Sequence, residues 1–228
     1  MDYILSGFVQ AILLLFQGDA QTYSAIFVTV RVTSYSMTAS LLLGIPLGFL
    51  LGYFEFKAKR PLRLVVDTLL ALPTVFIGLL VYAFLSNRGP MGHMGLLFTV
   101  PGIAIGQTIL ALPIVIALTA TAVESLDHNL RGTLISLGAD RIQLLLTSLR
   151  EARFSIIAAS LTALGRVMTE VGISMMVGGN IKWHTRTITT AIALETNKGL
   201  FSMGIALGLV LLLIAFLVNL SVSFLRKW

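Results

Sequence analysis

The residue types that could carry chemistry are sparse in this chain and do not form a catalytic set. The three histidines, His93, His128 and His184, are scattered and lack paired metal-ligand spacing. The chain has no cysteine and no GxxxxGK[ST] loop to hold a nucleotide phosphate. No serine–histidine or paired-aspartate set falls inside an apolar run. The sequence therefore predicts no catalytic residues, no metal site and no cofactor bound by this chain, and it indicates a conduit or a scaffold.

Two ionisable residues stand out because they lie in the middle of an apolar run. Arg166 and Glu170 are four residues apart, so on a helix they would share one face and could pair. Ionisable groups at membrane depth are costly and suggest a role along a pathway or at a gate. The alternative, which we favour over direct substrate contact, is a buried structural pair, because a self-neutralised pair binds an anion poorly.

A second polar region, residues 178–199, alternates small, hydroxyl and apolar residues. It is too polar to span a membrane and too apolar for a solvated loop, so we expect a re-entrant segment that closes the outer end of a pathway. An arginine among threonines could donate hydrogen bonds to an oxyanion. The candidate anion-binding or gate residues are Asn180, Arg186, Thr187 and Thr189. A loop that docks an outside partner, or that only packs, is the alternative.

Residues 124–153 interrupt the apolar runs with charge, yet they keep apolar residues at helical spacing in two stretches. Between these stretches, Gly138 can adopt the left-handed turn that ends a helix, and Asp140 can cap the next one. The pattern predicts a helix–turn–helix held just outside a membrane and offered to a soluble partner. The candidate coupling residues are Leu137, Gly138, Ala139, Asp140 and Arg141.

The composition predicts an all-α membrane protein. Hydrophobic residues make up 57% of the 228 residues and charged residues 11%, against roughly 25% charged in soluble proteins. A net charge of +6 would suggest nucleic acid as a partner of a soluble chain. Here the basic residues cluster at the ends of apolar runs, where they report orientation. We therefore expect a lipid bilayer around the chain and no nucleic acid.

The apolar runs predict about five transmembrane helices in a single domain, residues 23–228. The expected spans are 23–53, 64–85, 96–123, 154–177 and 200–224. The first span carries Gly44, Gly48 and Gly52, a ridge of small residues that allows close helix approach. Four prolines fall inside the spans and predict kinks around a pathway, with packing irregularity as the alternative for any single one; they are at positions 46, 73, 101 and 113.

Residues 1–22 are expected to form an N-terminal interfacial helix. Asp2 and the absence of Lys or Arg before the apolar run argue against a signal peptide. The run Ile4–Phe16 is short for the roughly 20 residues that a spanning helix needs. A sixth span is the alternative to a helix that lies on the membrane surface.

Three segments hold most of the positive charge: Lys57–Arg63, Glu124–Arg153 and Arg226–Lys227. With five spans, all three fall on one side of the membrane, and the positive-inside rule makes that side the cytoplasm. The sequence therefore predicts a multi-pass protein of the plasma (cell inner) membrane, with its N-terminus outside and its C-terminus in the cytoplasm.

The helix–turn–helix sequence LISLGADRIQLLLTSL resembles the cytoplasmic EAA loop of type I ABC importer permeases, with the LGA at Leu137–Ala139. It departs from that pattern at Gly132–Leu134, which occupies the EAA positions, and at Leu149–Arg150, where the family has LP. The stretches GIPLG, VDTLLALPTV and GRVMTEVG resemble further landmarks of the family. The outer stretch MMVGGNIKWHTRTITTAIALETNKG is similar to that of tungstate importer permeases, within the molybdate/tungstate/sulfate oxyanion group.

The resemblance implies a homodimer around a central pathway, with the type I ABC importer fold. It also implies two cytoplasmic ATPase subunits that grip the helix–turn–helix pairs, and an extracytoplasmic substrate-binding protein that delivers an oxyanion, tungstate in the first instance. ATP and Mg would then bind the ATPase partner, so this chain would be a transporter subunit and not an enzyme. Molybdate, sulfate or another solute is the alternative cargo, and a membrane scaffold or receptor with a docking knob is the alternative from a different class.

Overall fold

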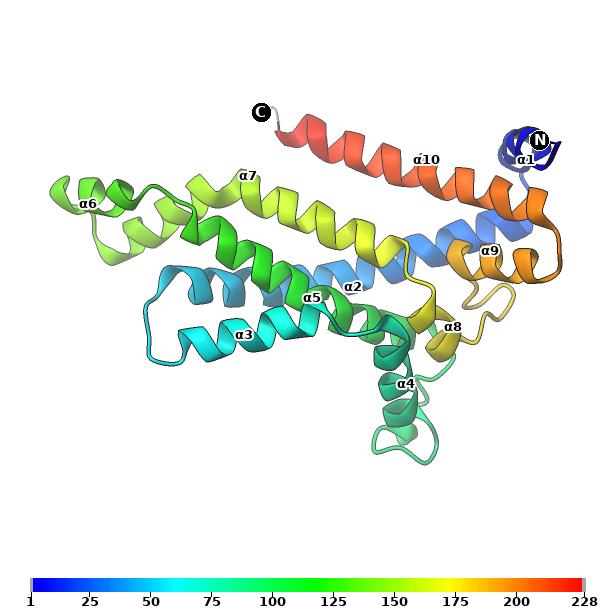
Figure 1. The fold of residues 1–228 in the computed structure, drawn as a ribbon, viewed down its shortest axis with the longest axis horizontal. Coiled ribbons are helices and arrows are strands. Elements are labelled where there is room, and N and C mark those ends of the chain that lie inside the picture. The colour runs from blue at the N-terminus through cyan, green and yellow to red at the C-terminus, as the bar shows by residue number, and fades with distance from the viewer. Residues whose placement is uncertain (1, 227–228) are drawn as a thin grey trace.

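The computed structural model describes residues 2–226, except for the side chains of residues 2, 128, 131 and 222–226. Every regular element in these residues is helical, which confirms the all-α prediction (Figure 1). In chain order the elements are α1 (Asp2–Phe16), α2 (Ala20–Tyr53), α3 (Lys59–Leu70), α4 (Thr74–Leu85), a short 3-10 turn η1 (Gly92–Met94), α5 (Val100–Glu124), α6 (His128–Ser136), α7 (Arg141–Met168), α8 (Gly172–Gly178), α9 (Ile188–Asn197) and α10 (Phe201–Arg226).

The long helices α2, α5, α7 and α10 run along the length of the molecule, with α6 at one end and α8, α9 and α1 at the other (Figure 1). Three helices, α2, α5 and α10, are long and apolar enough to cross a membrane by themselves. The bent pairs α3–α4 and α7–α8 raise the number of candidate spans to five. The expectation of about five spans is therefore confirmed.

The predicted glycine ridge lies in the contact between α2 and α5, which is the most extensive helix contact among the described residues. A Cβ added at Gly48 would lie 2.6 Å from the carbonyl oxygen of Ile116, and one at Gly52 would lie 2.6 Å from that of Ala120. Gly44 faces the Val115 side chain in the same way. Because a Cβ at Gly48 or Gly52 would collide with backbone atoms of α5, and one at Gly44 with the Val115 side chain, the glycines are what allow the two helices to touch.

The expected span 64–85 is not one helix but two helices that meet at a bend. Its two halves, α3 and α4, meet at 96°, and α4 projects sideways from the bundle in Figure 1. Pro73 caps the N-terminus of α4 with extended backbone and so lies at the break. Pro101 likewise falls in the first turn of α5, where a proline costs no hydrogen bond. Of the four prolines expected to kink a span, Pro46 and Pro113 lie in the interior of a helix, whereas Pro73 and Pro101 lie at the start of one.

The first helix, α1, is viewed end-on in Figure 1, whereas its neighbour α10 runs across the view. The two helices meet at the Tyr3 and Phe201 rings, whose centroids are 6.1 Å apart, and at Ser6 and Ser202, whose hydroxyls are 2.9 Å apart. An axis that lies across the bundle is the geometry of a helix in the membrane surface. The interfacial location of residues 1–22 stays a prediction that this arrangement favours.

The charged segments fall at one end of the bundle. The connection that contains Lys57 lies beside the end that carries α6, and the C-terminal end of α10 points the same way (Figure 1). Lys227, the last charge of the predicted set, lies outside the described residues. The described segments therefore share one side, as the positive-inside argument requires.

Candidate coupling knob and translocation face

The predicted helix–turn–helix is present, and its turn is built as the sequence predicts. Gly138 adopts a left-handed conformation with φ +80°, and the N–H of Ala139 donates to the carbonyl of Leu134 at 3.0 Å. The Asp140 carboxylate accepts from the N–H of Gln143 at 2.7 Å, and the Gln143 side chain accepts from the N–H of Asp140 at 2.9 Å. This reciprocal capping box fixes the start of α7. We call residues 128–149 the coupling knob.

The tip of the coupling knob is apolar and uncovered. Leu137 is 78% exposed, the side chains beside it on α6 and α7 are more than half exposed, and Gly138 has open space around it; these neighbours are Ile135, Ile142 and Leu146. Exposed apolar groups gathered on a polar segment mark a surface that another protein covers. The structure thus brings Leu137, Gly138, Ala139, Asp140 and Arg141 together in one projecting turn.

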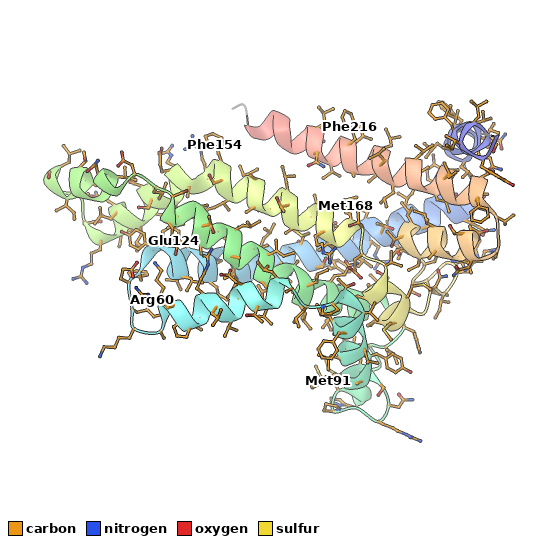
Figure 2. All side chains as sticks on the ribbon, viewed as in Figure 1. Arg60, Met91, Glu124, Phe154, Met168 and Phe216 are labelled. Atoms are coloured by element: carbon orange, nitrogen blue, oxygen red, sulfur yellow. The ribbon has the colours of Figure 1, made fainter. Side chains whose placement is uncertain are left out.

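One continuous helix connects the coupling knob to the expected membrane span. Helix α7 starts at Arg141 in the knob and continues unbroken to Met168 near the far end of the bundle, passing Phe154, where the expected span begins (Figure 2). A continuous helix of 28 residues is about 42 Å long at 1.5 Å per residue. The turn and the expected span are therefore parts of one continuous helix.

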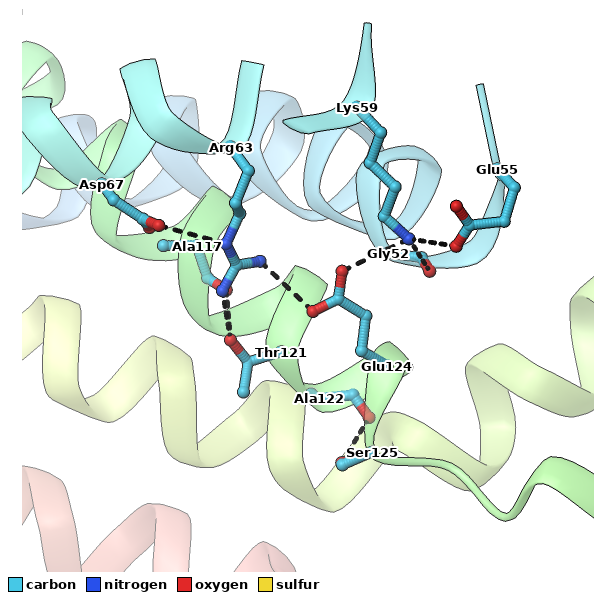
Figure 3. Close-up of polar contacts among 10 residues, drawn as sticks. All are labelled: Gly52, Glu55, Lys59, Arg63, Asp67, Ala117, Thr121, Ala122, Glu124 and Ser125. Atoms are coloured by element: carbon cyan, nitrogen blue, oxygen red, sulfur yellow. Dashed lines mark hydrogen bonds and ion pairs between the residues drawn. The ribbon is translucent and has the colours of Figure 1, made fainter. Parts of the chain in front are cut away.

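A network of charges lies beside the knob, between the start of α3 and the end of α5 (Figure 3). The Glu124 carboxylate lies 3.4 Å from Lys59 Nζ and 3.6 Å from Arg63 Nη1. Arg63 Nη2 donates to Thr121 Oγ1 at 2.7 Å, and Lys59 Nζ lies 2.7 Å from Glu55. We call these residues the α3–α5 charge network. The hydrogen bond to Glu55 raises the pKa of Lys59, which lies at the charged start of α3 before its apolar part, so this ammonium stays protonated.

Sequence reasoning missed the α3–α5 charge network, although a signal was present. Lys59, Arg63 and Asp67 follow one another at intervals of four, which places them on one helix face. Glu124, the partner that Lys59 and Arg63 share, is 57 residues beyond Asp67 in the chain, and only the fold brings it there.

The predicted Arg166–Glu170 pair does not form. Helix α7 ends at Met168, so the two residues do not share a helical face, and among the described residues they make no ion pair with each other. Glu170 is 4% exposed, and its carboxylate accepts from the N–H of Ile173 at 3.1 Å at the start of α8. The Arg166 residue is exposed on the surface of the protein. The intervals in the sequence could not show that the helix stops between them.

The exposed face of α7 within the expected span is unlike the exposed faces of its neighbours. Between residues 154 and 169 no large apolar side chain is exposed, and the exposed residues are Ser155, Thr162, Gly165, Arg166 and Thr169. By contrast, α10 exposes Leu212, Phe216 and Leu217. An apolar face suits lipid, whereas a polar face at that depth needs water or protein against it. We call the exposed side of α7 the polar face.

The outer residues 178–199 are more ordered than an open loop, because their second half is the helix α9. Arg186 Nε donates to Asn180 Oδ1 at 3.1 Å, and Arg186 Nη2 donates to the Asn180 carbonyl at 3.4 Å. Asn180 itself has φ +50°, a conformation that few residues other than glycine adopt. These two candidate anion-binding residues therefore hold each other and shape the connection between α8 and α9.

The two candidate threonines of this segment are buried. Thr187 is 2% exposed and caps α9, where its hydroxyl accepts from the N–H of Thr190 at 3.3 Å. The Thr189 hydroxyl donates to the carbonyl of Glu170 at 2.9 Å. The structure thus places Thr187 and Thr189 inside the protein, joined to their neighbours.

A buried polar bridge crosses the bundle at the same level and was not predicted. Gln107 in α5 accepts from the Ser36 hydroxyl of α2 and donates to the Ser174 hydroxyl of α8, both at 3.4 Å. All three residues are buried. The only signal in the sequence is one glutamine in an apolar run, which indicates an interhelical bond without naming its partner.

In the part of the chain that the structure describes, no group of three His, Asp or Glu side chains could hold a metal ion. The geometry of the described residues therefore offers no such metal cluster. It offers a coupling knob at one end, a polar face along a spanning helix, and a closed outer segment.

Comparison with known proteins identifies the family. Residues 44–228 match the model of the binding-protein-dependent transport system inner membrane component. The chain belongs to this family and, within it, to the type I ABC importer permeases, as the knob sequence predicted.

The relatives are similar over almost the full chain. The tungstate uptake system permease protein TupB of Campylobacter jejuni is 51% identical over 219 residues, which cover 96% of this chain and 92% of the relative. The protein of the same name from Peptoclostridium acidaminophilum is 39% identical, with 96% of each chain covered. The solved bacterial alginate ABC transporter, in complex with an alginate-bound periplasmic protein, has a chain of the same fold, with a TM-score of 0.77 at 19% identity, covering 98% of this chain and 86% of that one.

Proposed function

We propose that this chain is the permease subunit of an importer that moves tungstate into the cytoplasm. The observation that carries the proposal is the 51% identity to a tungstate uptake permease, which extends over 96% of the chain and so takes in the membrane spans as well as the family landmarks. The similarity to this relative is the reason for choosing tungstate as the substrate. The geometry of the knob and of α7 suggests how a partner would drive the subunit.

The driving partner is a cytoplasmic ABC ATPase that covers the tip of the coupling knob. The exposed Leu137 and Ile142 side chains would fill a groove on that partner, and Gly138 lets the turn enter without side-chain bulk. ATP and Mg bind the ATPase, and this chain contributes no group to hydrolysis. Movement of the ATPase pushes the knob, and the unbroken α7 carries that push into the bilayer.

The second partner is another copy of this chain, which faces the first across the polar face of α7. Two such faces enclose a hydrated pathway, so that Ser155, Thr162 and Thr169 contact water instead of lipid. Arg166 of each copy then provides an uncompensated positive charge beside the pathway. Because Glu170 is turned away and bonded to α8, the charge of Arg166 is available to a dianion.

A substrate-binding protein delivers the anion at the end of the bundle that carries α8 and α9. The outer candidates Asn180, Arg186, Thr187 and Thr189 act there as the rigid frame of the closed entrance and do not contact the ion directly. In this orientation the N-terminus lies outside the cell, and the knob and the C-terminus lie in the cytoplasm, as the basic segments require.

Reconstitution in vesicles tests the proposal. The chain, its ATPase subunit and its binding protein would be assembled, and tungstate, molybdate and sulfate accumulation measured with and without ATP. ATP-dependent tungstate accumulation that excess sulfate does not suppress is the expected result. Accumulation of another anion in its place would change the cargo, and an ATPase that fails to assemble would favour a scaffold or receptor with a different partner.

A further inference from the structure

Helix α3 is attached to the rest of the molecule in an unusual way. None of its residues is buried, and its apolar side chains, among them Leu62, Leu64 and Val65, point away from the bundle and are about half exposed or more. Three of its charged side chains, Lys59, Arg63 and Asp67, lie on the side of α3 that faces α5, and the first two pair with Glu124 (Figure 3). This inside-out arrangement suits a helix whose outer side meets lipid. Apolar packing therefore contributes little to its attachment, and polar contacts hold it.

Glu124 is the centre of that polar attachment. One carboxylate oxygen faces Lys59 Nζ at 3.4 Å and the other faces Arg63 Nη1 at 3.6 Å, so a single side chain forms ion pairs with two successive turns of α3. The Lys59 and Arg63 side chains are 15% and 26% exposed, whereas Glu124 is 37% exposed, so the cationic side of each pair is the shielded one. A carboxylate that pairs with two cations forms a network, and networks contribute more than isolated surface pairs.

The location of Glu124 connects it to the moving part. It is the last residue of α5, and Asp127, three residues later, caps the first helix of the coupling knob. An open cavity of about 450 Å³ lies beside the network, lined by Leu126, Leu130 and Ser148 on the knob side. The knob therefore has room to shift there, and its movement bears on Glu124 first.

The other end of α3 leads to the outer part of the bundle. At the 96° bend after Leu70, α3 passes into α4, and α4 packs against α8 through Ile77, Val81 and Ile173. Helix α8 begins where the polar face of α7 ends. A displacement of α3 is thus applied to the elements around the closed entrance by a route that does not use α7.

We propose that Glu124 is a positioning residue that ties α3 to α5 and transmits movement of the coupling knob to the bent span α3–α4. The inference rests on the proposed function, because it presumes an ATPase that moves the knob. In this account the basic residues Lys59 and Arg63 do more than orient the chain: together with Glu124 they form the second of two links between the knob and the pathway, the first being α7.

The test compares Glu124→Gln with a matched control, Asp67→Asn, in the reconstituted complex. Glu124→Gln removes the charge shared with α3, whereas Asp67→Asn removes an ion pair to Arg63 that lies within α3 and leaves α5 untouched. We measure tungstate accumulated per ATP hydrolysed. We expect Glu124→Gln to lower this ratio by roughly 2- to 30-fold, the range for residues that modulate coupling, with ATPase assembly unchanged. Asp67→Asn is expected to leave the ratio as it is.

A second experiment replaces the ion pair between α3 and α5 with a covalent cross-link. The natural chain has no cysteine, so the double variant Lys59→Cys/Glu124→Cys can be joined selectively by a flexible bis-maleimide. Restored accumulation per ATP on joining supports a mechanical tie. Equal ratios for Glu124→Gln and the natural chain, or a joined double variant as uncoupled as the unjoined one, would overturn the proposal. If the natural chain itself moves no tungstate, the proposed function fails instead, and the two failures are distinguishable.

Discussion

Two polar segments interrupt the apolar spans of this permease, and they are built in opposite ways. The coupling knob projects from the bundle, and its most exposed large apolar residue, Leu137, is 78% exposed. The outer residues 178–199 fold back on the bundle, and Thr187 and Thr189 are buried and bonded within it. A segment with satisfied groups is a structural part, whereas an apolar tip left uncovered is a surface for a partner.

Because of this difference, substitutions at the two ends of the bundle are expected to have different effects. A change in the knob should leave the fold intact and disconnect the ATPase, because the knob has few contacts with the bundle. A change in the outer segment should lower the stability of the bundle and leave the docking surface intact.

The largest effect is expected from Gly138→Val. At φ +80° a β-branched residue is strained by about 1–3 kcal/mol, and the turn reshapes to escape that strain. Co-purification with the ATPase subunit and ATP-dependent uptake should fall by at least about tenfold, as 1.4 kcal/mol implies. Gly132→Ala is the control, since Gly132 lies inside α6 with open space around it. Retention of the ATPase by Gly138→Val would contradict the docking role of the turn.

The two arginines Arg166 and Arg186 give a matched pair with the next largest effect. Arg166→Gln removes a charge from the polar face and is expected to lower tungstate uptake about tenfold, the size of one lost charge-assisted contact of roughly 1.5 kcal/mol, with the melting temperature unchanged. Arg186→Gln removes the bonds to Asn180 and is expected to lower the melting temperature instead. Uptake that responds to Arg186→Gln alone would move the anion contact to the outer segment.

A buried cap in the outer segment should affect stability alone. Thr187→Val keeps the volume but removes the hydroxyl that caps α9, at a cost of about 1–2 kcal/mol of unfolding free energy. The expected readout is a lower midpoint of thermal unfolding in detergent, with normal ATPase co-purification. Loss of the ATPase without loss of stability would show that the two ends are not independent.

The smallest effect is expected from Leu137→Ala. Shortening this exposed side chain should change the unfolding free energy by less than about 0.5 kcal/mol, because it is solvent-facing in the isolated chain. Affinity for the ATPase subunit should fall about fivefold, the equivalent of roughly 1 kcal/mol for truncating one of several apolar side chains that share the groove. Titration of the ATPase against the detergent-solubilised chain measures the loss, and an unchanged affinity would exclude Leu137 from the interface.

The local signals in the sequence were sufficient for the knob and for the helix contacts. Gly138 and Asp140 determine their own turn, and Gly48 determines how closely α2 approaches α5, because each acts through neighbours that periodicity reveals. The bend at Pro73 was misread as a kink, since a proline marks a break without stating its angle. Arg166 and Glu170 were misread as a pair because the end of α7 depends on how α8 packs.

Contacts between distant parts of the chain were beyond the reach of sequence patterns. Glu124 meets Lys59 and Arg63, and Gln107 meets Ser36 and Ser174, only because α5 lies at the centre of the bundle. A charge or an amide in a helix indicates that it has a partner, but the partner is selected by tertiary packing. The fold class and the knob were therefore predictable, and the polar face and the α3–α5 charge network were not.

Measuring tungsten in whole cells tests most directly whether this chain takes part in tungstate import. Cells that lack this gene would be compared with cells in which the natural gene or the Gly138→Val form is restored, in medium with trace tungstate and molybdate and excess sulfate. We predict that cell-associated tungsten falls in the deletion, returns with the natural gene and does not return with Gly138→Val. Unchanged tungsten in the deletion, with the gene expressed and no second uptake system operating, would contradict the assignment of tungstate as the cargo.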